Sequence, residues 1–198
     1  MSRKSIVVVG GGAAGATITR ILSSKIDPNT TTLTLVTARP FAVHLPATIR
    51  MTTTSEDKLE ETALIPYDNL FVKNNGTLKI GRVSTIEPGK EGRDGTIVLD
   101  TNERIRYDFL VLAPGAEWDG PLAFPDDRAA VLEHIKSWRG KFENAKGGIV
   151  LAGGGAVGLG TFSFVQAILF FLYGLMVIFL DQNMRASSKT CSPTKQSP

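Results

Sequence analysis

The chain has 198 residues, of which 42% are hydrophobic and 21% charged, values that are ordinary for a globular protein. Its length accommodates one domain, or one domain and part of a second. The net charge of +3 is small and lies partly in the last residues, which argues against a nucleic-acid-binding surface. The single cysteine, Cys191, excludes a disulfide framework within the chain.

The N-terminal residues bear on the cellular location of the globular part. Met1 to Lys4 lead directly into the apolar run Ile6–Val9, which leaves no room for a cleavable signal peptide. We therefore expect a cytoplasmic protein. A membrane-associated location through a later apolar stretch and a mitochondrial location are the alternatives.

The run Ile6–Val9 predicts a strand buried on both faces, followed by Gly10-x-Gly12-x-x-Gly15 and a helix over Ala16–Ser24. Gly10 permits a tight turn off the strand, Gly12 lets a pyrophosphate approach the backbone, and Gly15 lets the helix pack closely. The free N–H groups at the helix start would face the phosphates. This context favours dinucleotide binding over a structural glycine turn.

A second strand is predicted over residues 33–37. Thr37 occupies the place, 22 residues after Gly15, where an acidic residue usually holds ribose hydroxyls. Arg39 either contacts the adenosine half of a cofactor or lies in solvent. Pro46 predicts the start of a short helix, on which Arg50 either reaches the cofactor or lies at the surface.

The middle of the chain predicts mostly strands. Residues 52–61 indicate a loop or exposed helix, 78–86 a strand, and 85–108 a β-meander. The next apolar strand ends at Ala113-Pro114-Gly115, where Gly115 permits close approach to a ligand or to the first glycine turn.

A Pro-rich loop and a helix over Ala129–Asn144 follow, and Glu133 and His134 are expected at the surface of that helix. Residues 149–152 predict another buried strand. That strand leads into a second glycine motif of the same form, whose glycines are Gly153, Gly155 and Gly158.

Two such motifs, separated by a meander and a strand ending in Ala-x-Gly, resemble the flavoproteins with two dinucleotide-binding domains. The resemblance spans Lys4 to Gly158 and is closest to the apoptosis-inducing-factor-like and ferroptosis-suppressor-like NAD(P)H oxidoreductases. It implies FAD at the first motif, NAD(P)H at the second, and hydride passing from nicotinamide to flavin and on to a quinone-like acceptor. The CxxxxC pair of the glutathione-reductase branch is missing, which excludes that branch's chemistry.

The resemblance implies an α/β fold, with a Rossmann-like FAD-binding domain made of a parallel sheet and a β-meander. It also assigns cofactor contacts residue by residue, including a flavin-contacting role for Arg50 and an adenine-contacting backbone for Val83. The sequence itself offers no protein nucleophile, no catalytic acid–base pair and no metal-ligand spacing. The candidate cofactor-binding residues are Gly10, Gly12, Ala13, Ala14, Gly15, Thr37, Arg39, Arg50, Val83, Ala113, Gly115, Gly153, Gly155 and Gly158.

Several features depart from the family pattern. Thr37 replaces an acidic residue, Pro114 replaces a threonine, and the pattern stops soon after Gly158. The sequence therefore predicts a truncated oxidoreductase. The alternative is a catalytically inactive, membrane-attached FAD-binding fragment. A flavin monooxygenase and an NAD-only Rossmann protein are disfavoured by the second glycine motif.

The stretch 161–180 contains no Asp, Glu, Lys or Arg, and as a helix it would reach roughly 30 Å, the thickness of a bilayer core. Three interpretations stay open: a membrane anchor, translated unspliced sequence, or a buried helix. The expected domains are 1–148 for FAD, 149–160 for the start of an incomplete NAD(P)-binding domain, 161–180 for an apolar helix, and 181–198 for a disordered tail.

Overall fold

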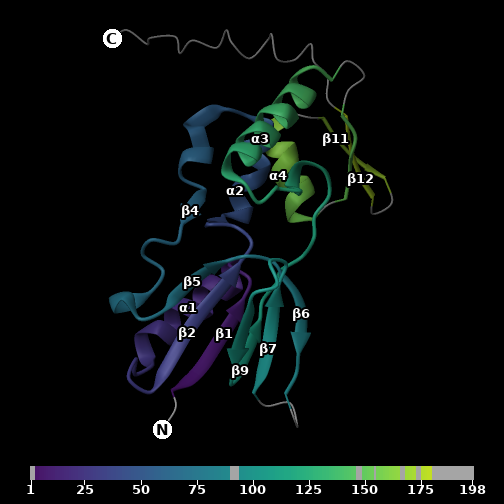
Figure 1. Cartoon of the computed structure of the whole chain (residues 1–198). Helices are drawn as coiled ribbons and strands as arrows, with labels where there is room; N and C mark the ends of the chain where they lie inside the picture. The colour runs from purple at the N-terminus through teal and green to yellow at the C-terminus, as the bar shows by residue number, and fades with distance from the viewer. Residues whose placement is uncertain are drawn as a thin grey trace, which may run out of the picture.

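The computed structural model describes residues 3–89, 94–145, 149–153, 155–165, 168–172 and 175–179. Its lower half in Figure 1 contains a four-stranded parallel sheet with an adjoining antiparallel sheet, and its upper half, the helical half, combines helices with short strands. The predicted tail 181–198 lies outside the described residues.

The parallel sheet has the strand order β5-β2-β1-β9. Helix α1 (Ala13–Lys25) connects its two central strands. This arrangement confirms the predicted strand–glycine turn–helix unit and the Rossmann-like fold class. The strands are β1 (Lys4–Val9), β2 (Thr31–Thr37), β5 (Thr77–Ile80) and β9 (Phe109–Leu112).

The central strand β1 is buried on both faces, as its unbroken apolar run predicts. Val7 packs toward the antiparallel sheet with Ile97 and Leu99, whereas Val8 packs toward α1 with Leu35. Both valine side chains are fully buried. Burial on both faces is the usual environment of parallel strands and accounts for the Val/Ile-rich sequence.

The predicted meander is confirmed as an antiparallel sheet of order β6-β7-β8. The single strand predicted over 78–86 is instead two strands in two sheets, because the chain leaves the parallel sheet at Gly81. There the Gly81 amide donates to the Thr37 carbonyl at 2.9 Å. The meander strands are β6 (Val83–Glu87), β7 (Gly95–Leu99) and β8 (Arg104–Tyr107).

The helical half lies beyond the carboxyl ends of the parallel strands (Figure 1). A separate apolar core holds it together, including Phe41, Met51, Leu64 and Ile135. Its elements are β3 (Phe41–Val43), α2 (Leu45–Thr53), η1 (Glu56–Glu61), β4 (Leu64–Pro66), η4 (Gly120–Leu122), α3 (Arg128–Glu143) and α4 (Ala156–Val165). The short helix η2 (Val72–Asn74) packs instead against α1, where the Val72 amide donates to Ser23 Oγ at 3.0 Å.

The late apolar stretch differs from its prediction. An apolar helix is present, but α4 ends at Val165, and the antiparallel strands β11 (Ile168–Leu172) and β12 (Leu175–Phe179) follow. The short strand β10 (Leu151–Ala152) pairs with β12. The helix predicted over 161–180 was therefore wrong in extent, since an apolar run without periodicity, rich in aromatic and β-branched residues, also suits strands.

The helices of the described residues were also compared with the length of a bilayer core. None of them combines the length and the apolar character needed to cross a membrane.

Candidate dinucleotide-binding site

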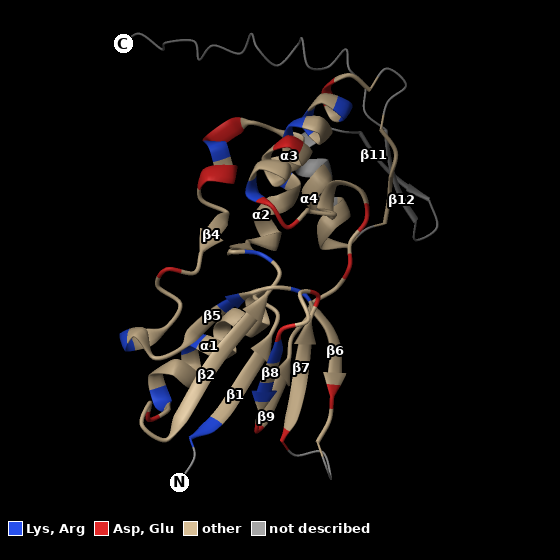
Figure 2. Cartoon of the chain, viewed as in Figure 1, with Lys and Arg blue, Asp and Glu red and all other residues tan. Residues whose placement is uncertain are grey.

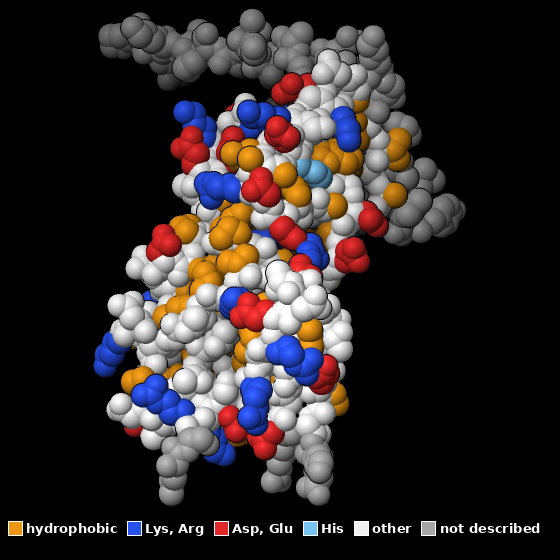
Figure 3. Space-filling model, viewed as in Figure 1, with side chains coloured by type: hydrophobic (Ala, Val, Ile, Leu, Met, Phe, Trp, Pro, Cys, Tyr) orange, Lys and Arg blue, Asp and Glu red, His pale blue; other side chains and the backbone are white. Residues whose placement is uncertain are grey.

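A cleft of about 1050 Å³ lies between the carboxyl ends of the parallel strands and the helical half. Figure 3 shows hydrophobic side chains gathered between the two halves of the molecule. The lining comes from the first glycine turn, the end of β2, the start of β6, the segment 114–126 and one face of α3. A volume of this size suits a large cofactor, because drug-sized ligand pockets span about 300–1,000 Å³.

The first glycine turn closes against the end of β9. Gly10 has φ +102°, and a Cβ there would overlap the carbonyl oxygen of Ala113. A Cβ at Gly15 would overlap the Gly10 carbonyl, so α1 packs directly on the turn. Only a residue without a side chain fits either position.

Gly12 differs from these two glycines because open space surrounds the position of its missing side chain. It lines the cleft and is the N-cap of α1, with φ −70°. The first amides of a helix have no partner within the helix, and they concentrate the positive end of its dipole. The turn therefore presents main-chain donors to the cleft, which is the arrangement that binds phosphate.

The end of β9 forms the opposite side of the turn. The Ala113 amide donates to the Val9 carbonyl at 2.8 Å, which aligns the ends of the two strands. Pro114 and Gly115 then line the cleft, and Gly115 has φ +79°. Ala113 supports the turn rather than lining the cleft.

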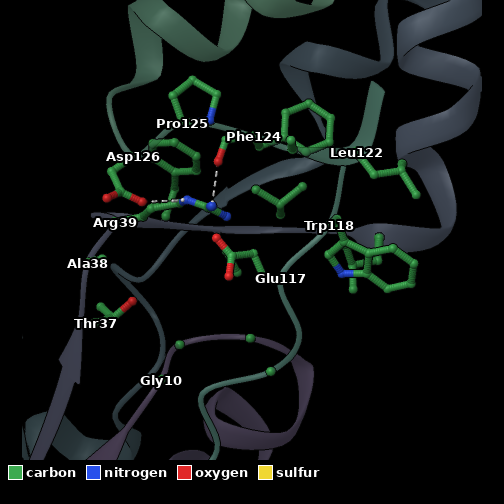
Figure 4. Close-up of a pocket in the computed structure, with 18 of the residues that line it drawn as sticks. Gly10, Thr37, Ala38, Arg39, Glu117, Trp118, Leu122, Phe124, Pro125 and Asp126 are labelled. Carbon is green, nitrogen blue, oxygen red and sulfur yellow. Dashed lines mark hydrogen bonds and ion pairs between the residues drawn. The ribbon is translucent and has the colours of Figure 1, made fainter. Parts of the chain in front are cut away.

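An arginine–aspartate cluster marks another part of the cleft (Figure 4). Arg39 Nε donates to Asp126 Oδ1 at 3.1 Å, and its Nη2 donates to the Phe124 carbonyl at 2.6 Å. Arg82 Nε donates to the other oxygen of Asp126 at 2.8 Å. All four residues line the cleft, together with Val83. The cluster joins three segments that are far apart in the sequence.

Seven of the fourteen predicted site residues line the cleft. Thr37 and Arg39 line the cleft at the end of β2, as Gly10, Gly12 and Ala13 do at the turn. Ala14 and Gly15 lie on the first turn of α1, outside the lining of the cleft.

Arg50 is not brought to the cleft, against the expectation for a flavin-contacting arginine. It lies on α2 and forms ion pairs with Asp57 and, at 3.8 Å, Glu56. The two acidic residues belong to η1, which the sequence predicted only as a loop or exposed helix. The sequence did not predict that these two acidic residues would pair with Arg50.

The second glycine motif repeats the packing of the first in the described residues. Gly153 has φ +117°, and a Cβ at Gly158 would overlap the Gly153 carbonyl. Gly155 precedes α4 and has open space around it. This turn lies outside the cleft described above.

Sequence reasoning missed the apolar wall of the cleft. Trp118, Leu122 and Phe124 come from the segment that was predicted only as a Pro-rich loop. His134 was expected at the surface. Instead it is half-buried in the cleft wall, with ring centroids 5.3 Å from Phe124 and 6.3 Å from Trp138. The available signal was a tryptophan and a phenylalanine, Trp118 and Phe124, among closely spaced prolines.

Comparisons with known proteins agree with this geometry. The pattern of the pyridine nucleotide-disulphide oxidoreductase family matches residues 4–186. FAD-dependent oxidoreductase FVFD30 of Flammulina velutipes is 45% identical over 109 residues, 55% of this chain and 33% of that protein. Apoptosis-inducing factor homolog B of Dictyostelium discoideum is 27% identical over 159 residues, 78% of this chain and 37% of that protein.

A solved structure supports the fold. Reduced CoADR-RHD of Bacillus anthracis superposes with a TM-score of 0.56 at 17% identity, over 84% of this chain and 31% of that chain. The chain spans about a third of the length of the curated relatives that it matches. The resemblance inferred from the glycine motifs is confirmed: this chain belongs to the pyridine nucleotide-disulphide oxidoreductase family.

Proposed function

We propose that the chain binds FAD in the cleft and acts as an FAD-dependent NAD(P)H oxidoreductase with a quinone-like acceptor. The observation that carries the proposal is the open main chain at Gly12, at the start of α1, facing a cleft large enough for a dinucleotide. When bound, the flavin would supply the hydride chemistry. The protein would bind it, orient it and exclude water from it.

The residues present fit such a cofactor. The amides around Gly12 and Ala13 would hold the diphosphate, because a side chain is missing where the phosphates must approach. Thr37, Arg39 and the Val83 backbone would lie along the adenosine half. The wall containing Trp118, Leu122 and Phe124 would cover the cofactor with apolar surface.

The strand end at β9 would set the position of the other half of the cofactor. Ala113 and Gly115 leave little side-chain volume beside the glycine turn, so a flat ring could lie against the backbone there. Arg50 is left out of the proposed contacts because it lies outside the cleft lining.

We also infer that residues 149–160 begin a second dinucleotide-binding unit, which would take NAD(P)H. The support is that the second motif packs as the first one does. Gly158, its third glycine, packs against the carbonyl of Gly153, its first, between the end of β10 and the start of α4. Gly155 would lie against the diphosphate of NAD(P)H, as we propose that Gly12 lies against that of FAD. The division of the chain into 1–148 and 149–160 is part of this proposal.

Purified chain supplied with FAD tests the function. We expect bound flavin to be bleached by NADH or NADPH and restored by a short-chain quinone, with continuous loss of nicotinamide absorbance. A chain that binds FAD but leaves NADH and NADPH unoxidised would support the alternative, a catalytically inactive FAD-binding protein. A chain that takes up no FAD would refute both functions.

A further inference from the structure

Tyr67 is a buried tyrosine in contact with the first glycine turn. It follows β4, is 7% exposed, and its hydroxyl donates to the Gly11 carbonyl at 2.5 Å. A Cβ at Gly11 would overlap this hydroxyl and lie 2.7 Å from Thr37 Oγ1. The turn is therefore closely packed on the Tyr67 side and open on the Gly12 side.

This contact has a consequence for the peptide that joins Gly11 to Gly12. In a trans peptide the carbonyl and the following N–H point in opposite directions. The Gly11 carbonyl points at Tyr67, so the Gly12 N–H points away from Tyr67. Gly12 has open space around it and lines the cleft.

A peptide between two glycines is easily reversed, because glycine tolerates most backbone conformations. In the reversed orientation the Gly11 carbonyl oxygen would face the ligand and repel a phosphate. Tyr67 also lines the cleft, and a donor that holds the Gly11 carbonyl at its hydroxyl favours the orientation that presents the Gly12 amide. Tyr67 is such a donor, and it comes from a segment 56 residues away.

We propose that Tyr67 is a positioning residue for diphosphate recognition, holding the Gly11–Gly12 peptide so that the Gly12 amide faces the cleft. The inference rests on the proposed function, since it concerns the site assigned to the FAD diphosphate. Burial raises the pKa of the Tyr67 hydroxyl, which therefore keeps its proton and remains a donor at neutral pH.

The test compares Tyr67→Phe with Tyr107→Phe. Tyr107 is a matched control, since it is 8% exposed but lies on β8, outside the cleft lining. We expect Tyr67→Phe to raise the dissociation constants of FAD and ADP about 3- to 10-fold, the effect of one lost hydrogen bond. Adenosine, which has no phosphate, should bind both variants as it binds the unchanged chain.

The amide spectrum of the unchanged chain supplies a second measurement that needs no variant. The Gly12 amide signal should shift on addition of ADP and stay in place with adenosine. A folded Tyr67→Phe variant with unchanged ADP affinity, or a Gly12 amide signal that does not shift when ADP is added, would overturn the role of Tyr67 and leave the proposed function standing. Failure of the unchanged chain to bind FAD would overturn the proposed function and this inference with it.

Discussion

The three glycines of the first motif have different physical roles. Gly10 and Gly15 have no room for a side chain because carbonyl oxygens occupy the space, whereas Gly12 has open space on the cleft side. Packing therefore requires two of them, and the proposed ligand requires the third.

This difference predicts that Gly12→Ala and Gly15→Ala separate binding from folding. Gly12 has φ −70°, which alanine adopts readily, so Gly12→Ala should change stability by less than about 1 kcal/mol. Its methyl group would stand where the diphosphate approaches, and FAD affinity should fall. Gly15→Ala should cost about 3 kcal/mol, the upper end for overpacking, because a backbone oxygen is the obstacle.

Thermal or urea unfolding combined with FAD titration measures both effects. If Gly12→Ala binds FAD as the unchanged chain does, the diphosphate does not lie against Gly12.

Arg39 gives a second prediction at this scale. It holds the Phe124 carbonyl and Asp126, and so ties the apolar wall to the end of β2. Arg39→Ala should weaken FAD binding about 2- to 10-fold through loss of these charged hydrogen bonds. Arg82→Ala is the comparison, because Arg82 lines the same cleft and pairs with the same Asp126, but its side chain is 66% exposed, and exposed ion pairs contribute little. Equal losses in both variants would contradict the role given to Arg39.

At the residue scale, the strand–glycine turn–helix geometry could be predicted because local geometry alone decides it. The positions of Gly10, Gly12 and Gly15 follow from a strand, a turn and a helix that are adjacent in the chain. Arg50 and the wall around Trp118 depend on which distant segments fold against them, and no spacing in the sequence encodes those neighbours.

At the scale of elements, ion pairs join segments of the helical half, and charges of both signs are interspersed there (Figure 2). Glu60 on η1 accepts two hydrogen bonds from Arg139 on α3, at 3.0 and 2.7 Å. Arg139 Nε also donates to the Met51 carbonyl at the end of α2, at 2.7 Å. One arginine thus connects three elements around the apolar core.

This pair predicts a specific pH dependence. The hydrogen bonds from Arg139 hold the pKa of Glu60 below its usual 4.5 in the folded chain. The ionised carboxylate therefore stabilises the fold above that usual value, and the contribution declines as the pH falls through 4.5 toward the lowered pKa. Glu60→Gln should lose about 1–3 kcal/mol at pH 7 and show a smaller further loss toward pH 4.

Urea unfolding at several pH values measures this dependence. Glu143→Gln, which changes an exposed glutamate at the end of α3, is the control and should follow the unchanged chain. A Glu60→Gln variant whose stability falls with pH as steeply as that of the unchanged chain would contradict the assignment.

Elements with a clear pattern were predicted well. Both central strands, α1, α3 and the meander have periodicity or turn residues that select one structure. The run 161–180 has neither, and its described part divides into the end of α4 and two strands. The strand predicted over 78–86 was divided by Gly81, where pairing with Thr37 ends and the chain crosses to the other sheet.

At the scale of the whole molecule, the cleft arises because the helical half lies across the carboxyl ends of the parallel strands (Figure 1). In open α/β sheets this edge is where ligands bind. The sequence predicted the sheet and its glycine turn, and so one side of the cleft. The opposite wall is built by α3 and the segment before it, whose docking depends on the apolar core around Met51 and Ile135.

The most direct test of the account is an FAD titration of the purified chain followed by flavin fluorescence, with ADP as competitor. We expect saturable quenching at one FAD per chain that ADP reverses and adenosine reverses only weakly, because the Gly12 turn grips the diphosphate. Quenching that ADP and adenosine reverse equally well, or no quenching at all, would contradict a diphosphate site at this turn.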